Sequence, residues 1–214
     1  MLLNITNGDY LNDKLSKENS GKFFPFREAM IQGLASSPIF DECFISQRAK
    51  SLGVSEEFYK QNAKDVLALA NHHVKNVKIR LWFGKDTFCQ LNLLTLLAYL
   101  EQVGYEGEIE LVLVDDETGN ILQDGISVKL GQYLKIYQAV LIKKQMPNVL
   151  GVIDKRAVEL YFDFLSPNGN LANLIRQNQN LTKDELVVLL LENSKKYGLS
   201  DCNVKELLSR VKIW

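Results

Sequence analysis

Hydrophobic positions in the first half of the chain recur with the period of β-strands in some segments and of helices in others. Every second residue from Val77 to Phe83 is apolar, which is the pattern of a half-buried strand. The segment from Ile109 to Val114 is almost continuously apolar, as expected of a central strand buried on both faces. Shorter segments of strand character precede these two at residues 2–6 and 22–26.

Segments with the helical period of about 3.6 residues lie between these strands. They cover residues 10–17, 27–34, 39–74 and 87–103. Gly53-Val54-Ser55 breaks the third segment, and Ser55 can cap the helix that follows. Thr87 and Gln90 match a capping box at the start of the fourth. This alternation predicts an α/β fold with a parallel-rich, Rossmann-like sheet flanked by helices.

Helical patterns dominate the second half of the chain. Only residues 126–130 keep a weak strand pattern. Thr182 and Glu185 form a further capping box. The helices predicted here span residues 132–144, 155–165, 171–178, 182–197 and 203–211. We therefore predict an α/β domain over residues 1–125 and a mostly helical C-terminal lobe over residues 126–214.

Composition and charge are those of an ordinary globular protein. Of the 214 residues 46% are hydrophobic, and 25 basic against 26 acidic side chains give a formal net charge of −1. A chain so close to neutral has no overall field that draws it to nucleic acid or to an anionic membrane, and we expect neither as a partner. No apolar stretch approaches the roughly 20 residues that span a bilayer, and the N-terminus has no basic leader, so we expect a soluble cytoplasmic protein.

The cysteines and histidines predict neither a metal site nor a nucleophile. Cys43, Cys89 and Cys202 lie far apart, which suits a reduced compartment, and Cys89 has the character of a packing residue. The only histidines, His72 and His73, are adjacent and would point apart on a helix. Motifs of P-loop NTPases, standard dinucleotide-binding folds, zincins and α/β-hydrolases are absent.

The candidate site begins at Thr6-Asn7-Gly8-Asp9, because open α/β sheets bind ligands at the carboxyl ends of their strands. Gly8 permits a positive φ in this turn, and the backbone N–H groups around Asn7 and Gly8 suit an anion such as phosphate. Thr6 belongs to the same candidate binding turn. Two roles of Asp9 stay open: it caps the helix, or it holds a cation or a hydroxyl-bearing substrate.

Two arginines are candidates for holding an anion. Arg27 and Arg48 are able to clamp a phosphate or a carboxylate in bidentate fashion. Glu28 follows Arg27 directly, and an adjacent Arg-Glu pair is more often a solvated surface feature than a site.

A second strand end supplies the remaining candidates. Asp86 follows the predicted strand that ends at Phe83, and Gln90 lies one helical turn further on. Capping of the helix is the alternative role of Asp86. Since Asp9 and Asp86 both end predicted parallel strands, they should meet at one edge of the sheet, where two carboxylates can bind a divalent cation or share acid/base work.

These residues give the chain a resemblance to a bacterial family, domain of unknown function 1835. The family's pattern is matched, in chain order, by Ile5–Asp9, Phe26-Arg27-Glu28, Arg48, Leu81-Trp82-Phe83, Asp86 and Gln90. Gly198-Leu199-Ser200 is similar to the family's C-terminal helical region, so the resemblance covers nearly the whole chain. The resemblance implies an α/β domain with a polar cleft and an association with transcriptional regulation, but no particular reaction.

The chain departs from that pattern at four positions. Asn4 stands where a histidine is usual, Tyr10 where a small hydroxyl residue is, Leu34 where a proline is, and Gly84 where an acidic residue is frequent. If these four positions contribute to a reaction common to the resembled family, this chain has an altered form of that activity or has lost it.

Two functions from different classes follow. The first is a pocket for a small anionic or nucleotide-like ligand, with metal-assisted hydrolytic or transfer chemistry. In it the anion is held by Asn7, Gly8 and Arg27 or Arg48, and a cation is bound or protons are moved by Asp9, Glu28 and Asp86. Neither a cofactor nor a metal is specified.

The alternative is a non-enzymatic regulatory or interaction module that acts through its helical lobe. The tail from Leu199 to Trp214 has a faint helix-turn-helix character and carries the basic residues Lys205, Arg210 and Lys212. Trp214 is a packing anchor or a dimer contact. We expect a homodimer under either function.

Overall fold

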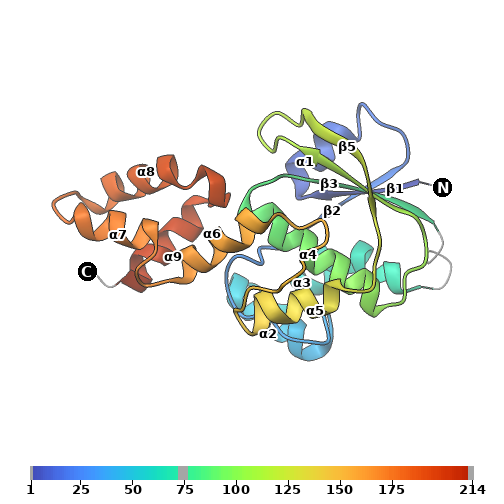
Figure 1. The fold of residues 1–214 in the computed structure, drawn as a ribbon, viewed down its shortest axis with the longest axis horizontal. Helices are drawn as coiled ribbons and strands as arrows, with labels where there is room; N and C mark the ends of the chain where they lie inside the picture. The colour runs from blue at the N-terminus through green and yellow to red at the C-terminus, as the bar shows by residue number, and fades with distance from the viewer. Residues whose placement is uncertain (1, 72–76, 212–214) are drawn as a thin grey trace.

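The computed structural model describes residues 2–71 and 77–211 and contains a five-stranded sheet in the order β2-β1-β3-β4-β5 (Figure 1). The strands are β1 (Leu2–Asn7), β2 (Lys22–Phe26), β3 (Lys78–Phe83), β4 (Ile109–Val114) and β5 (Ile121–Val128). The first four strands are parallel, and β5 pairs antiparallel with β4. The predicted α/β fold with a mainly parallel sheet is confirmed.

Helices cover the two faces of the sheet unequally. One side is covered by α2 (Glu42–Leu52), α3 (Glu56–Leu67), α4 (Thr87–Gln102) and α5 (Tyr133–Tyr137), with η1 (Ala68–Ala70) after α3 and a π-helical turn, η3 (Gln138–Ile142), after α5. The other side is covered by α1 (Asp9–Leu15) (Figure 1). The larger core therefore lies on the side of α4.

The alternation of apolar residues along β3 divides its side chains between two cores. Ile79 and Leu81 pack in the large core with the residues of α4, whereas Trp82 packs with Leu11 and Leu15 of α1. Helix α4 is buried over almost all of its length. A helix enclosed on all sides needs no polar face, which explains why most of its residues are apolar.

The predicted break between two polar helices is confirmed. Gly53 ends α2 with φ 68°, and the Ser55 hydroxyl accepts the N–H of Phe58 at 3.2 Å at the start of α3. The capping box of Thr182 and Glu185 is also confirmed, at the start of α8 (Lys183–Asn193).

The predicted helix at residues 27–34 is wrong, because the chain forms turns and irregular backbone there. The guanidinium of Arg48 donates to the backbone carbonyl oxygens of Ala29 (3.0 Å), Gln32 (2.7 Å) and Leu34 (3.3 Å). A helix would use these oxygens in its own ladder. Hydrogen bonds from a distant side chain therefore override the local helical pattern.

The start of α4 also differs from the prediction. Asp86, rather than Thr87, is the N-cap, since its carboxylate accepts the N–H of Cys89 at 3.0 Å. Gln90 consequently does not form a capping box with Thr87. The structure thus shows the capping role that was left open for Asp86.

Strand β5 extends the sheet past the predicted division at residue 125. Its residues 121–125 are exposed, so they lack the alternation that marks a half-buried strand. Helix α5 follows and packs on α4. The predicted boundary therefore falls inside β5, and the helices that stand apart from the sheet begin with α6 (Lys155–Leu165).

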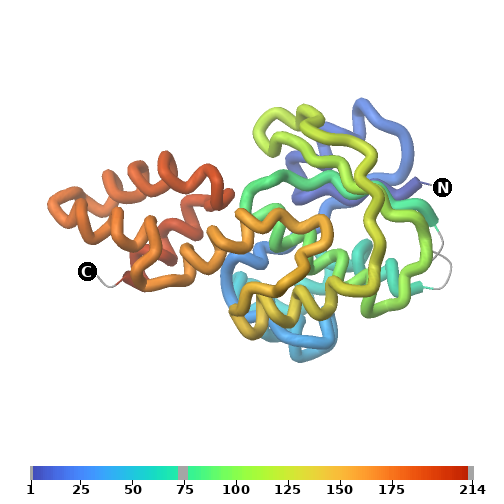
Figure 2. The backbone as a smooth tube through the Cα atoms, in the orientation of Figure 1, coloured from blue at the N-terminus to red at the C-terminus, as the bar shows by residue number. Residues whose placement is uncertain are grey.

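Three helices lie at the far end of α6, away from the sheet (Figure 2). They are α7 (Asn170–Gln177), α8 and α9 (Asp201–Val211), with the short helix η4 (Lys195–Tyr197) between α8 and α9. From here on we call the segment from α7 to α9 the lobe. The chain at η4 returns to α4, where the Thr87 hydroxyl is 3.5 Å from the carbonyl oxygen of Lys196. No helix in residues 2–71 and 77–211 is long and apolar enough to cross a membrane.

Candidate functional site

The strand order places a topological switch point between β1 and β3. The chain passes from β1 to β2 on one side, and β3 pairs with β1 on the other. Open α/β sheets bind ligands outside the carboxyl ends of two such strands. Asn7 ends β1, Asp86 follows β3, and Asp116 follows the neighbouring strand β4. The sequence placed the first two residues at this edge but not the third.

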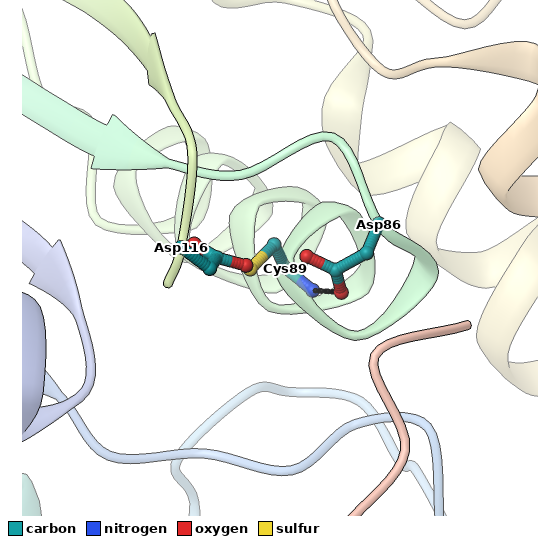
Figure 3. A group of neighbouring side chains, drawn as sticks. All are labelled: Asp86, Cys89 and Asp116. Atoms are coloured by element: carbon teal, nitrogen blue, oxygen red, sulfur yellow. Dashed lines mark hydrogen bonds between the residues drawn. The ribbon is translucent and has the colours of Figure 1, made fainter. Parts of the chain in front are cut away.

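The side chains of Asp86, Cys89 and Asp116 meet at this edge (Figure 3). One potential ligand atom from each lies within 4.8 Å of the other two. The Cys89 thiol donates to Oδ2 of Asp116 at 2.6 Å, and its sulfur accepts an N–H from Asn7 at 2.8 Å. We call Asp86, Cys89 and Asp116 the switch-point triad.

The turn that carries Asp116 is held by helix α1. The Tyr10 hydroxyl donates to the carbonyl oxygen of Glu117 at 2.7 Å. The ammonium group of Lys14 donates to the carbonyl oxygen of Thr118. The tyrosine that departs from the resembled pattern thus helps to place Asp116.

Two glycines allow backbone to approach the triad closely. A Cβ atom on Gly84 would overlap the carboxylate of Asp116, and one on Gly198 would overlap that of Asp86. The acidic residue that the resemblance leads one to expect at position 84 would therefore compete with Asp116 for the same space. Gly198 belongs to the lobe, so the lobe seals one side of the triad.

Electrostatics at the triad favour bound protons in the absence of a cation. Burial, and then the neighbouring Asp86 carboxyl, raises the pKa of Asp116 to about 8. Burial and the two carboxylates raise the pKa of the Cys89 thiol well above its usual range. A protonated, enclosed thiol is a poor nucleophile.

One oxygen of the triad has no hydrogen-bond partner. Oδ1 of Asp116 is buried, and within the described ranges no donor reaches it. A buried carboxylate oxygen without a donor costs free energy unless a proton or a cation satisfies it. With the sulfur of Cys89 and the carboxylate of Asp86 nearby, the arrangement can bind a metal ion.

A hollow of about 660 Å³ opens beside the triad, at the seam between the α/β part and the lobe. Its size suits a small-molecule ligand, since such sites measure roughly 300–1,000 Å³. It is lined by Lys85, Asp86, Phe88, Val114, Asp115, Asp116, Glu117, Leu122, Leu191, Lys195, Gly198 and Leu199.

The turn after β1 lines a separate hollow of about 280 Å³, together with Arg27, Glu28 and Phe88. Gly8 has the expected positive φ, 83°, but its N–H bonds to the carbonyl oxygens of Thr6 and Phe26. Asp9 pairs with Arg27 at 2.8 Å, and 61% of its side chain is exposed. A carboxylate thus pairs with Arg27, and the Gly8 amide is engaged within the chain.

Glu28 and Arg48 form a buried ion pair. Their side chains are 2% and 0% exposed, and Nη2 of Arg48 lies 2.7 Å from the Glu28 carboxylate. The Tyr59 hydroxyl donates to the same carboxylate at 2.6 Å, and burial, followed by the negative charge of Glu28, raises the pKa of Tyr59. Together with the backbone bonds already described, this leaves Arg48 no free donor for a ligand, and we assign the pair to the architecture.

The two remaining candidates also have structural roles. Thr6 is buried, and its hydroxyl donates to the carbonyl oxygen of Gly8 at 3.1 Å. Gln90 is buried, donates to the carbonyl oxygen of Gly84 at 2.7 Å and accepts the N–H of Asp154 at 2.9 Å. The predicted residues therefore do not all gather in one hollow. Asp86 joins the triad and lines the 660 Å³ hollow, whereas the 280 Å³ hollow is lined by Asn7, Gly8, Asp9, Arg27 and Glu28. Asn7 contacts the triad through the sulfur of Cys89.

Sequence reasoning missed Cys89 and Asp116. Asp115 and Asp116 directly follow a predicted central strand. This position at the carboxyl edge of the sheet is the feature of the sequence from which Asp116 could have been predicted. Cys89 lies three residues after Asp86, within the first turn of the helix that Asp86 caps, which brings its sulfur back to the same edge.

The two basic residues of the C-terminal tail that the structure describes, Lys205 and Arg210, are engaged by other side chains. Lys205 pairs with Asp201 at 3.0 Å, and Arg210 stacks on the ring of Phe164 at 4.7 Å. Lys212 and Trp214, like His72 and His73, lie outside the described residues.

Replacing Gly198 by alanine should destabilise the protein more than the same change at Gly53. Both glycines end a helix with nearly equal φ, 66° and 68°, so each alanine meets left-handed strain of about 1–2 kcal/mol. A Cβ at Gly53 meets nothing within 4 Å, whereas one at Gly198 overlaps Asp86. We expect guanidinium unfolding to show an additional loss of roughly 1–3 kcal/mol for Gly198→Ala. Equal losses would show that the lobe does not press on the triad.

Comparison of the chain with family models, with curated proteins and with solved structures gives no match in any of the three. The fold and the switch-point triad alone therefore describe the chain: it is an α/β protein with two carboxyl groups and a thiol gathered at the carboxyl edge of its sheet.

Proposed function

We propose that this protein binds a divalent metal ion of the zinc class with Asp86, Cys89 and Asp116, and uses it to polarise a small substrate in the adjoining hollow. The observation that carries the proposal is the convergence of two carboxylates and a thiol within 4.8 Å, one of whose oxygens is buried without a partner. Hydrolysis or group transfer is the class of reaction such a site supports.

The donor set favours zinc over the hard cations. Calcium and magnesium prefer ligand sets made only of oxygen, whereas zinc takes cysteine sulfur together with carboxylate oxygen. Three protein ligands leave a fourth position open, as in catalytic zinc sites. That position is available to substrate because the triad residues Asp86 and Asp116 line the 660 Å³ hollow.

Asn7 suits the role of an outer residue in such a site. Its N–H already points at the sulfur of Cys89, and Asn92 donates to the Asn7 side-chain oxygen at 2.9 Å. A thiolate bound to metal gains from such a donor, which fixes the orientation of the ligand. Membership in the resembled family stays a separate prediction on which this proposal does not depend.

The purified protein, stripped with a chelator and then titrated, should bind one zinc ion. Cobalt(II) should give the near-ultraviolet absorption of a thiolate–metal bond. Cys89→Ser should abolish that absorption and weaken zinc binding by more than about 100-fold, since even outer residues of metal sites contribute 10- to 100-fold. Asp86→Asn and Asp116→Asn should weaken binding as well.

Cys202→Ser is the matched control, because Cys202 is an exposed cysteine outside the triad. It should leave zinc affinity and the cobalt spectrum unchanged. Zinc bound equally well by the wild type and by Cys89→Ser would refute the proposed site, as would a wild type that takes up neither metal.

A further inference from the structure

Two lysines flank the hollow from opposite sides of the seam. Lys85 follows β3, and Lys195 belongs to η4 of the lobe. Within residues 2–71 and 77–211, neither ammonium group has an ion pair or a hydrogen bond to the protein, whereas Lys78 and Lys205 are paired with acids. The neighbouring Lys196 lies over the ring of Tyr197 at 5.4 Å and does not line the hollow. Lys85 and Lys195 are thus free to hold an anion.

The rest of the wall supplies apolar surface. It is formed by Phe88, Val114, Leu122, Leu191 and Leu199, again from both sides of the seam. Leu122 is 53% exposed, although it lies on a concave surface. A ligand with an apolar body would remove this surface from water, which is a principal source of affinity in small-molecule sites.

The metal decides when an anion can enter. Without it, the carboxylates of Asp86, Asp115 and Glu117 alone outnumber the two ammonium groups, and an anion is repelled. A divalent ion that displaces the protons of Asp116 and Cys89 leaves the net charge of the triad unchanged, but its open position can bind an anion directly. Anion binding should therefore require the metal.

We propose that the ligand of this site is a phosphate monoester with an apolar or aromatic body, whose phosphate lies between the metal, Lys85 and Lys195. A phosphate has three terminal oxygens, enough to meet a metal and two ammonium groups at once. A carboxylate has only two oxygens in one plane. This inference rests on the metal site proposed above.

Calorimetric titration of the zinc-loaded protein with phenyl phosphate, inorganic phosphate and phenylacetate tests it. Phenyl phosphate should bind most tightly, because its ring covers the apolar wall. Lys85→Gln and Lys195→Gln should each weaken its binding about tenfold, the loss of one charge-assisted hydrogen bond. Lys196→Gln removes the same charge from the same short helix and should change nothing. The zinc-free protein should not bind phenyl phosphate.

Zinc content, measured before each titration, separates the two proposals. Variants that hold zinc but bind no phenyl phosphate would overturn this inference and leave the metal site standing. A wild type that takes no zinc would overturn both. Binding of phenylacetate as tight as that of phenyl phosphate, or equal losses in Lys195→Gln and Lys196→Gln, would also overturn the assignment of a phosphate held by these lysines.

Discussion

Arg48→Met should lower the free energy of unfolding by about 3–5 kcal/mol, the range measured when one partner of a buried ion pair is removed. Methionine keeps most of the apolar volume of the arginine stem, but Glu28 loses its counter-charge while its side chain is 2% exposed. The carbonyl oxygens that fix residues 29–34 lose their donors as well. Since whole domains are stable by about 5–15 kcal/mol, the variant should be close to unfolding.

Guanidinium unfolding, followed by the fluorescence of the buried Trp82, measures this effect. Lys205→Met is the control, because its ion pair with Asp201 is 56% exposed on both sides and should contribute less than about 1 kcal/mol. Adding Glu28→Gln to Arg48→Met should recover part of the loss, since the uncompensated charge is then gone. A loss for Arg48→Met no larger than that for Lys205→Met would contradict the architectural role of the pair.

The same ion pair shows why part of the fold escaped prediction. Strands β1 to β4 and most helices follow from the spacing of apolar residues, because a single core face imposes that spacing locally. The segment at residues 27–34 has helical spacing as well, but Arg48, which lies in α2, donates hydrogen bonds to its backbone carbonyl oxygens. A local pattern contains no information about such a distant donor.

Strand β5 was misplaced for a different reason. Residues 121–125 are exposed, so no hydrophobic period marks them. Their strand conformation comes from antiparallel pairing with β4, for instance Leu113 with Gln123. Backbone pairing at a sheet edge depends on the neighbouring strand and leaves little trace in the side chains.

The candidate site was predicted as an edge of the sheet, but its members were only partly identified. The carboxyl ends of β1 and β3 follow from the order of elements, which correctly placed Asn7 and Asp86. Which side chains reach the switch point depends on packing: Glu28 turns inward to Arg48, and Asp116 turns toward Cys89. Topology therefore predicts where a site lies better than which residues form it.

The second large effect concerns the dependence of stability on pH in the metal-free protein. The pKa of Asp116 is raised from 3.8 to about 8, first by burial and then by Asp86. Between these values the folded protein keeps a proton that the unfolded chain releases. Stability from this group is thus fully present below about pH 4 and is lost as pH rises through about 8.

Unfolding curves in the presence of a chelator, taken from pH 5 to pH 8, should therefore show wild-type stability falling by up to about 1 kcal/mol per pH unit relative to Asp116→Asn. Asparagine cannot ionise, so the stability of Asp116→Asn lacks the pH-dependent contribution of this group. Zinc should reverse the trend in the wild type, because the ion displaces the protons of the triad and binds more tightly as pH rises. Asp124→Asn, at an exposed acid of β5 that pairs with Arg80, should leave the slope unchanged. Parallel pH profiles for the wild type and Asp116→Asn would show that Asp116 ionises normally in the folded protein, and that the triad has no need of a cation.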